Sequence, residues 1–236
     1  MRENLDPMGH AIADYHAMGR AARLRVLSLK FDEDEIPVPM LFRRFDEMPA
    51  IEQEALKVAD GAILDVGAGA GCHSLALQAM EKRVTAIDIS PLAVATMRQR
   101  GVHDVREQDF FTLDGQFDTI LMLMNGIGIV GTLSRMDAFF LQVDHLLAPG
   151  GQVLCDSSDL CFLYEDEDGI IDLTGVEGYY GEVTYRMQYK SIKGEHFPWL
   201  FIDPETLREQ AAAHGYHCDI LVRGEHYDYL ARLTRR

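Results

Sequence analysis

The sequence predicts an α/β fold with a mostly parallel sheet flanked by helices. From residue 62 onward, short apolar segments alternate with helical patterns, which is typical of successive βαβ units. The first apolar segment runs into a glycine-rich stretch, "VGAGAG" at 66–71. The chain ends in two β-forming segments joined by a short link near Gly224, and so tight a link predicts an antiparallel last strand.

The predicted elements follow in a regular order along the chain. A seven-stranded sheet is expected, with strands at 62–66, 83–88, 105–109, 117–124, 152–157, 217–223 and 227–233. Helices are expected at about 72–81, 91–100, 134–147 and 204–214. The second of these helices has clear boundaries, because Ser90 is a natural N-cap, Pro91 suits the first helical position and Gly101 suits the C-terminal stop.

Two parts of the chain fall outside this rhythm. Residues 1–60 are expected to form a mainly helical lead-in that caps the main domain at 61–236. Residues 160–202 are rich in acids, glycine and aromatics, and "GEVTYRMQYK" and "EHFPWLFI" predict a hairpin. We expect this segment to be an insertion after the fifth strand that acts as a lid.

Composition excludes several classes of partner. The net charge is −16, from 22 basic and 38 acidic residues, and a field of this sign repels nucleic-acid backbones and anionic membrane surfaces. The N-terminal stretch lacks the apolar core of a secretion signal, and the longest uncharged run, 119–133, is shorter than the ~20 residues that span a bilayer. The cysteines show no C-x-x-C spacing, so a cytoplasmic protein with reduced thiols is expected.

The glycine-rich stretch predicts a ligand that approaches bare backbone at a helix N-terminus. A dinucleotide fingerprint starting at Gly67 would need glycine at position 72, where the chain has Cys72. Asp65, two residues before the first glycine, is unfavourable for a pyrophosphate and suits a ligand with a cationic part. The spacing G-x-G-x-G therefore argues against a dinucleotide.

Further polar residues end the neighbouring strands, where ligands of open α/β sheets bind. Asp88 ends the second strand at the position where a carboxylate grips ribose hydroxyls. Asp109 suits an adenine amino group, with Phe110 or Ile89 covering a ring face, and Asn125 ends the fourth strand. A nucleoside with a cationic tail and no phosphate fits these positions, which predicts S-adenosylmethionine as cofactor.

The motifs "LDVGAGAG", "VTAIDIS", "EQDFF", "FDTILMLMNGIGIV" and "LAPGGQVLCDSSD" resemble, in order and spacing, those of class I S-adenosylmethionine-dependent methyltransferases. The resemblance implies a Rossmann-like fold and methyl transfer by in-line displacement. It also implies a cofactor-binding set of Asp65, Gly67, Ala68, Gly69, Gly71, Asp88, Ile89, Asp109, Phe110, Met124, Asn125 and Gly126. The fourth strand ends in "NGIG" instead of the D/N-P-P-Y of many DNA and amino-group methyltransferases, and it lacks the aspartate-rich end of aminopropyltransferases.

The acceptor is expected to be a small molecule, and the net charge favours a neutral or cationic one. The candidates for acceptor binding or catalysis are Asn125, Asp156, Tyr15 and His196, followed by His16, Asp159 and Tyr164. No metal is expected, because the histidines and cysteine of "HGYHC" straddle a helix end and a strand. A protein acceptor, a non-catalytic cofactor-binding sensor and an NAD-dependent dehydrogenase remain as alternatives.

Overall fold

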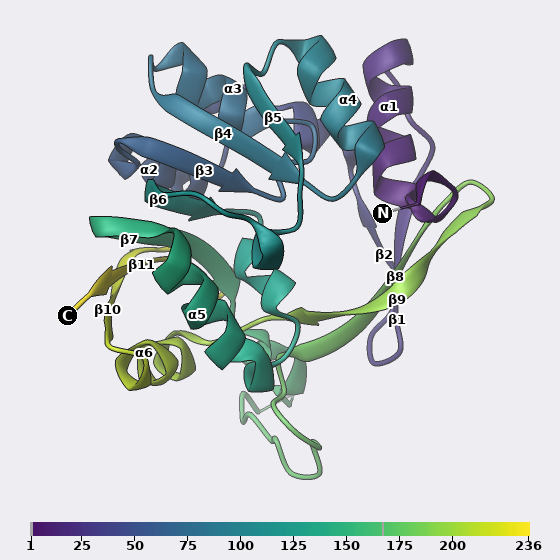
Figure 1. Cartoon of the computed structure of the whole chain (residues 1–236). Helices are drawn as coiled ribbons and strands as arrows, with labels where there is room; N and C mark the ends of the chain where they lie inside the picture. Colours follow the sequence, from purple (N-terminus) through teal and green to yellow (C-terminus); the bar gives the residue numbers. More distant parts are fainter. Residues whose placement is uncertain (1, 167) are drawn as a thin grey trace.

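The main sheet of the computed structural model has the predicted architecture. The model describes residues 2–166 and 168–236, so Met1 of the predicted lead-in and Glu167 of the predicted insertion lie outside the described residues. The strand order is β10-β11-β7-β6-β3-β4-β5 (Figure 1). The strands are β3 (Ala62–Val66), β4 (Arg83–Asp88), β5 (Asp104–Glu107), β6 (Phe117–Met122), β7 (Leu147–Ser158), β10 (Tyr216–Arg223) and β11 (Asp228–Arg235).

Strands β3 to β7 run parallel, whereas β11 pairs antiparallel with both β7 and β10. The fold class predicted from the sequence is confirmed. Strand β6 is shorter than predicted, because Met124 and Asn125 adopt left-handed backbone conformations (φ 62° and 59°) that end the extended chain.

Helices cover both faces of this sheet. One face packs against α5 (Met136–Leu146) and α6 (Pro204–Ala213) through a core that includes Phe139 and Leu207. The other face packs against α2 (Ala50–Val58), α3 (Cys72–Ala79) and α4 (Pro91–Arg100). None of the helices in the described ranges is long and apolar enough to cross a membrane.

The predicted boundaries of α4 show how local chemistry sets the helix ends. The Ser90 hydroxyl accepts a hydrogen bond from the Ala93 amide, and Pro91 occupies the first turn. Gly101 ends the helix in a left-handed conformation, with φ 93°. Because Ser90 lies two residues after the end of β4, this cap also fixes where the chain turns away from the sheet.

The lead-in contains helices, as predicted, and also two short strands that the sequence prediction did not include. After η1 (Glu3–Leu5) and α1 (Pro7–Met18) the chain forms two strands, β1 (Leu24–Ser28) and β2 (Asp34–Ile36), then η2 (Val38–Phe42) and η3 (Phe45–Glu47). The predicted hairpin of the insertion is present as β8 (Glu182–Tyr189) and β9 (Ile192–Leu200). The two hairpins join in a second sheet of order β2-β1-β8-β9.

Helix α1 lies between this second sheet and the main domain (Figure 1). Its N-cap, Asp6, accepts hydrogen bonds from the Gly9 amide and from the Ser90 hydroxyl, so one carboxylate joins the start of α1 to the start of α4. Ile12, on the next turn, is fully buried and packs with Ala70 of the glycine loop. The lead-in is therefore attached directly to the loop that follows β3.

Candidate cofactor site

The loop after β3 exposes bare backbone at the carboxyl ends of the strands. Gly67, Gly69 and Gly71 all have positive φ, at 68°, 57° and 80°. A Cβ on Gly67 would meet no protein atom within 4 Å, whereas a Cβ on Gly71 would lie 2.9 Å from Val102. The loop therefore uses Gly71 for close packing of α3 and leaves space at Gly67, which fits a ligand that approaches the backbone.

Asp88 lies beside this loop and is held in position by two backbone amides. Its Oδ2 accepts from the Gly69 amide and its Oδ1 from the Ser90 amide, each at 2.8 Å. Burial raises the pKa of Asp88 to about 6. Each oxygen keeps a lone pair after these bonds, so the carboxylate can accept two further hydroxyl protons.

Asp65, at the end of β3, is buried and 2% exposed. Its Oδ2 accepts a 2.6 Å hydrogen bond from the Ser74 hydroxyl of α3. Burial raises the pKa of Asp65. The carboxyl group of Asp65 thus fixes α3 against β3, directly before the glycine loop.

A buried network of charged groups, which the sequence prediction missed, surrounds Asp65. His73 Nε2 lies 2.7 Å from Glu52 Oε2, and Arg43 Nη2 lies 2.7 Å from both oxygens of the same carboxylate. Burial alone would lower the pKa of His73, but the neighbouring Cys72 and Glu52 raise it well above its usual value. The network ties two parts of the lead-in, Arg43 and α2, to α3. The three residues share no local spacing, so no sequence motif points to the cluster.

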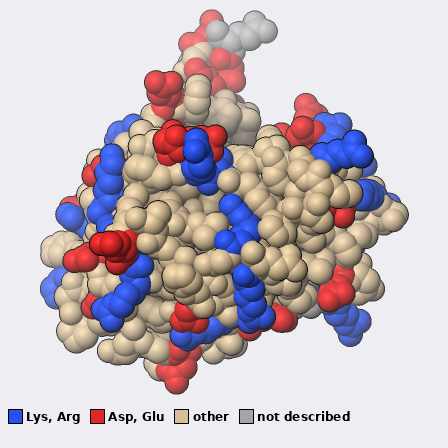
Figure 2. Space-filling view, turned by 90° about the horizontal axis from the view of Figure 1, so that it is seen from above, with Lys and Arg blue, Asp and Glu red and all other residues tan. Residues whose placement is uncertain are grey.

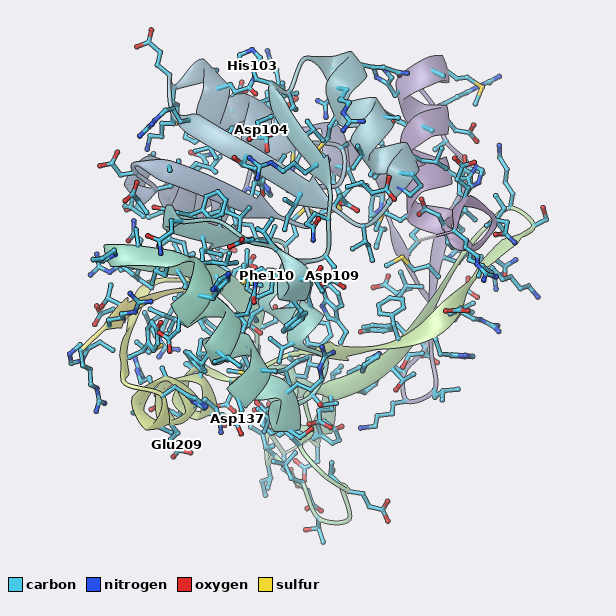
Figure 3. All side chains as sticks on the ribbon, viewed as in Figure 1. His103, Asp104, Asp109, Phe110, Asp137 and Glu209 are labelled. Atoms are coloured by element: carbon cyan, nitrogen blue, oxygen red, sulfur yellow. The ribbon has the colours of Figure 1, made fainter. Side chains whose placement is uncertain are left out.

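The residues expected near adenine differ in how they are placed. Asp109 is exposed, and its carboxylate accepts from the Phe111 amide to cap the short helix η4 (Phe110–Thr112) (Figure 3). Phe110 is 3% exposed and packs on Phe139 in the core, so its ring is not free at the surface. Ile89 is 45% exposed next to Asp88. Of Phe110 and Ile89, Ile89 is therefore the one placed to cover a face of adenine.

The turn after β6 is held by a buried carboxylate. Asp156, in β7, accepts from the Met124 amide at 3.1 Å and from the Gly126 amide at 3.2 Å. Asn125 accepts from the Ser158 amide and donates to the Leu200 carbonyl. Burial raises the pKa of Asp156 to about 7. Two consecutive non-glycine residues with positive φ are unusual, and such strain is concentrated at functional sites.

The remaining acceptor candidates are dispersed. Tyr15 packs on Phe42, with ring centroids 4.7 Å apart, and lines two cavities of about 480 and 340 Å³ within the lead-in. His16 is exposed at the end of α1. Asp159 caps η7 (Leu160–Tyr164) and accepts from the Tyr180 hydroxyl at 2.6 Å.

Two further candidates take part in contacts of the second sheet and the insertion. The Tyr164 hydroxyl donates to the Tyr180 carbonyl. His196 is exposed on β9, on the side opposite its neighbour Phe197. The structure therefore brings Asp65, Gly67, Gly69, Asp88, Met124, Asn125, Gly126 and Asp156 to the strand ends, and Asp159 directly follows the end of β7. It does not bring His16, Tyr164 or His196 to them. In the described part of the chain, no group of three acids, histidines or cysteines forms a metal site.

Comparison with known proteins identifies the family. A family model described as "Methyltransferase domain" matches residues 63–151. A SAM-dependent methyltransferase from Bacteroides fragilis, crystallised with S-adenosyl-L-homocysteine, is 54% identical with a TM-score of 0.94, over 100% of this chain and 97% of that chain. No curated protein sequence matches the chain.

More distant structures share the fold. The DhpI-SAM-HEP complex is 24% identical with a TM-score of 0.59, over 78% of this chain and 84% of that chain. The sugar N-methyltransferase KedS8 from Streptoalloteichus sp ATCC 53650 is 19% identical with a TM-score of 0.53, over 83% of this chain and 88% of that chain. With the glycine loop and strand-end acids in place, and 54% identity over the whole length to one methyltransferase, the chain belongs to the class I S-adenosylmethionine-dependent methyltransferases.

Proposed function

We propose that this methyltransferase modifies a small molecule held between the strand ends of the main sheet and the second sheet. The observation that carries the proposal is the position of the second sheet. A Cβ on Gly128 would collide with the Trp199 indole, so β9 lies against η5 (Gly126–Val130), which follows β6. Ile12 of α1 packs on the glycine loop from the other side. A ligand bound at the strand ends between these two contacts would be of limited size.

The roles of the cofactor-binding residues follow from their placement. Asp88 is suited to the ribose hydroxyls, Ile89 to a face of adenine and Asp109 to its amino group. Gly67 and Gly69 let the methionine part approach the backbone, and Asp65 provides negative charge beneath the loop. The turn formed by Met124, Asn125 and Gly126 then borders the side from which the acceptor approaches.

When bound, S-adenosylmethionine supplies a methyl group activated on a sulfonium. The protein's part is to align the acceptor and exclude water, and alignment alone can lower a barrier by ~7–11 kcal/mol. Asp156 keeps the turn after β6 in a single conformation through its two amide bonds. We assign Asp156 a positioning role instead of a catalytic one, because its two oxygens bind the Met124 and Gly126 amides that shape the turn.

The surface supports a small-molecule acceptor over nucleic acid. On the face seen in Figure 2, the described Lys and Arg side chains are interspersed with Asp and Glu and separated by uncharged surface. With a net charge of −16, such a surface offers no attraction to a phosphate backbone. We propose a cytoplasmic location, consistent with four free cysteines. No observation favours the sensor or the dehydrogenase.

Transfer of labelled methyl groups tests the proposal. The purified protein is incubated with methyl-labelled S-adenosylmethionine and a cell extract, which is then separated by size. We expect label in compounds below about 1 kDa, lost in a variant that lacks the Asp88 carboxylate. Label confined to protein, or no transfer under any condition, would contradict the proposed function.

A further inference from the structure

The second sheet has two chemically different faces. Along β8 the side chains of Val183, Tyr185 and Met187 alternate with polar ones, and the register pairs Val183 with Trp199 and Tyr185 with Phe197. These residues therefore share one face, which we call the inner face. On the opposite face, which we call the outer face, Thr184, His196 and Pro198 are exposed.

The inner face is the side of the second sheet that packs on α1 and on η5. At one end of β8, Tyr189 is buried with Ala11 of α1, and at the other end Trp199 lies against Gly128 of η5. Tyr185 and Phe197 lie between these two contacts, are half-buried, and have ring centroids 6.4 Å apart. They therefore lie on the inner face between its contact with α1 and its contact with η5.

Charge is sorted between the two faces. Among the described residues of these four strands, every Arg, Lys and His falls on the outer face by register, namely Arg25, Arg186, Lys193 and His196. The inner face has an acid, Asp34, which pairs with Val26. Lys30, in the link between β1 and β2, donates to the Glu182 carbonyl at the start of β8.

The chemistry of this face determines what it can bind. Aromatic faces attract cations, and an ammonium over a ring is stabilised by ~0.5–2 kcal/mol. An acceptor with a carboxylate would be repelled by Asp34 and by the faces of the Tyr185 and Phe197 rings. It would find no basic residue of the four strands on the same face. Burial, followed by the charge of Asp34, raises the pKa of Tyr185 to about 12, so its hydroxyl stays neutral at physiological pH.

We propose that the acceptor is an amine whose carbon skeleton packs on Tyr185 and Phe197 with its nitrogen on the side of Asp34; this rests on the proposed small-molecule function. The amine binds as an ammonium and loses a proton to water before reaction. The nitrogen lone pair then forms the N–C bond while the C–S bond breaks and its electron pair passes to sulfur. The methylated ammonium releases one N–H proton to water.

The single tryptophan of the chain makes this measurable. Trp199 fluorescence is followed while protein saturated with S-adenosylhomocysteine is titrated with 3-phenylpropylamine, 3-phenylpropanol or 3-phenylpropionate. We expect the amine to bind at least about tenfold more tightly than the carboxylate, since about 1.4 kcal/mol separates them. Equal binding, or preference for the carboxylate, would overturn the proposal.

Neighbouring residues on opposite faces provide a matched control. Phe197→Leu should weaken binding of 3-phenylpropylamine about tenfold, and Asp34→Asn should reduce the preference for the amine. His196→Leu, one position away on the outer face, should leave binding unchanged. Equal effects of Phe197→Leu and His196→Leu would show that the inner face is not the binding surface.

The labelled products formed in the cell extract distinguish the amine proposal from the broader proposal of a small-molecule acceptor. An N-methyl product is retained by a cation exchanger in acid and resists alkali, whereas a methyl ester releases labelled methanol in alkali. Labelled small molecules that are esters or ethers would overturn the amine proposal and leave the small-molecule function intact. Label confined to protein would overturn the small-molecule function itself.

Discussion

At the scale of single residues, Asp88 carries the clearest expectation for cofactor binding. Removing its carboxylate in Asp88→Ala loses charged hydrogen bonds of ~1.5–3 kcal/mol each, so we expect affinity for S-adenosylhomocysteine to fall about ten- to a hundredfold in calorimetry. Because the pKa of Asp88 is raised to about 6, wild-type affinity should also weaken as pH falls below that value. Asp104→Ala, at the opposite end of β5 from the site (Figure 3), is the control. Unchanged affinity in Asp88→Ala would remove this residue from the site.

Asp156 should control the pH dependence of stability. Its pKa is about 7 in the folded protein, against 3.8 for an ordinary aspartate, so folding favours the protonated form. The stability from this preference is fully present below the unfolded pKa of 3.8 and is lost as pH rises from there through about 7. The thermal midpoint of the wild type should therefore fall from about pH 4 to about pH 7, and Asp156→Asn should flatten this fall. An identical slope in both proteins would contradict the assignment.

At the scale of elements, the attachment of the lead-in to α3 depends on Glu52 of α2. Glu52→Gln leaves Arg43 and His73 buried beside each other without a carboxylate, and breaking a buried ion pair costs about 3–5 kcal/mol. We expect a loss of that size in the free energy of unfolding in urea. Glu47→Gln is the matched control, since its side chain is 53% exposed compared with 6% for Glu52, and should cost under about 1 kcal/mol. Equal losses would show that the network does not stabilise the fold.

The elements also show what the sequence could predict. The strand–loop–helix units were predictable because caps such as Ser90 and stops such as Gly101 act within a few residues. The second sheet was not, because β1 is short and its partner lies far along the chain, with Leu24 opposite Tyr189. The ion network around Glu52 could not be predicted either, because it joins residues that are distant in sequence. The burial of Phe110 likewise depends on a distant contact, with Phe139 of α5.

At the scale of the whole molecule, the main sheet provides the cofactor rim and the second sheet provides the opposite wall. The rim could be predicted because the polar residues that end parallel strands meet at one edge, so Asp65, Asp88 and Asn125 come together whatever the loops do. The wall is made by two hairpins distant in sequence, and only the folded chain brings them together. On the proposal made above, the acceptor is therefore selected by parts of the chain that no local sequence pattern connects.

The most direct test of the account compares two glycines. Gly67 and Gly101 both have positive φ, and a Cβ on either would meet no protein atom within 4 Å. Alanine at each position should therefore destabilise the fold by a similar amount, about 1–2 kcal/mol, but only Gly67 lies where the cofactor approaches the backbone. We expect calorimetry to show at least about tenfold weaker binding of S-adenosylhomocysteine to Gly67→Ala and unchanged binding to Gly101→Ala. Wild-type affinity in Gly67→Ala would contradict the cofactor site described above.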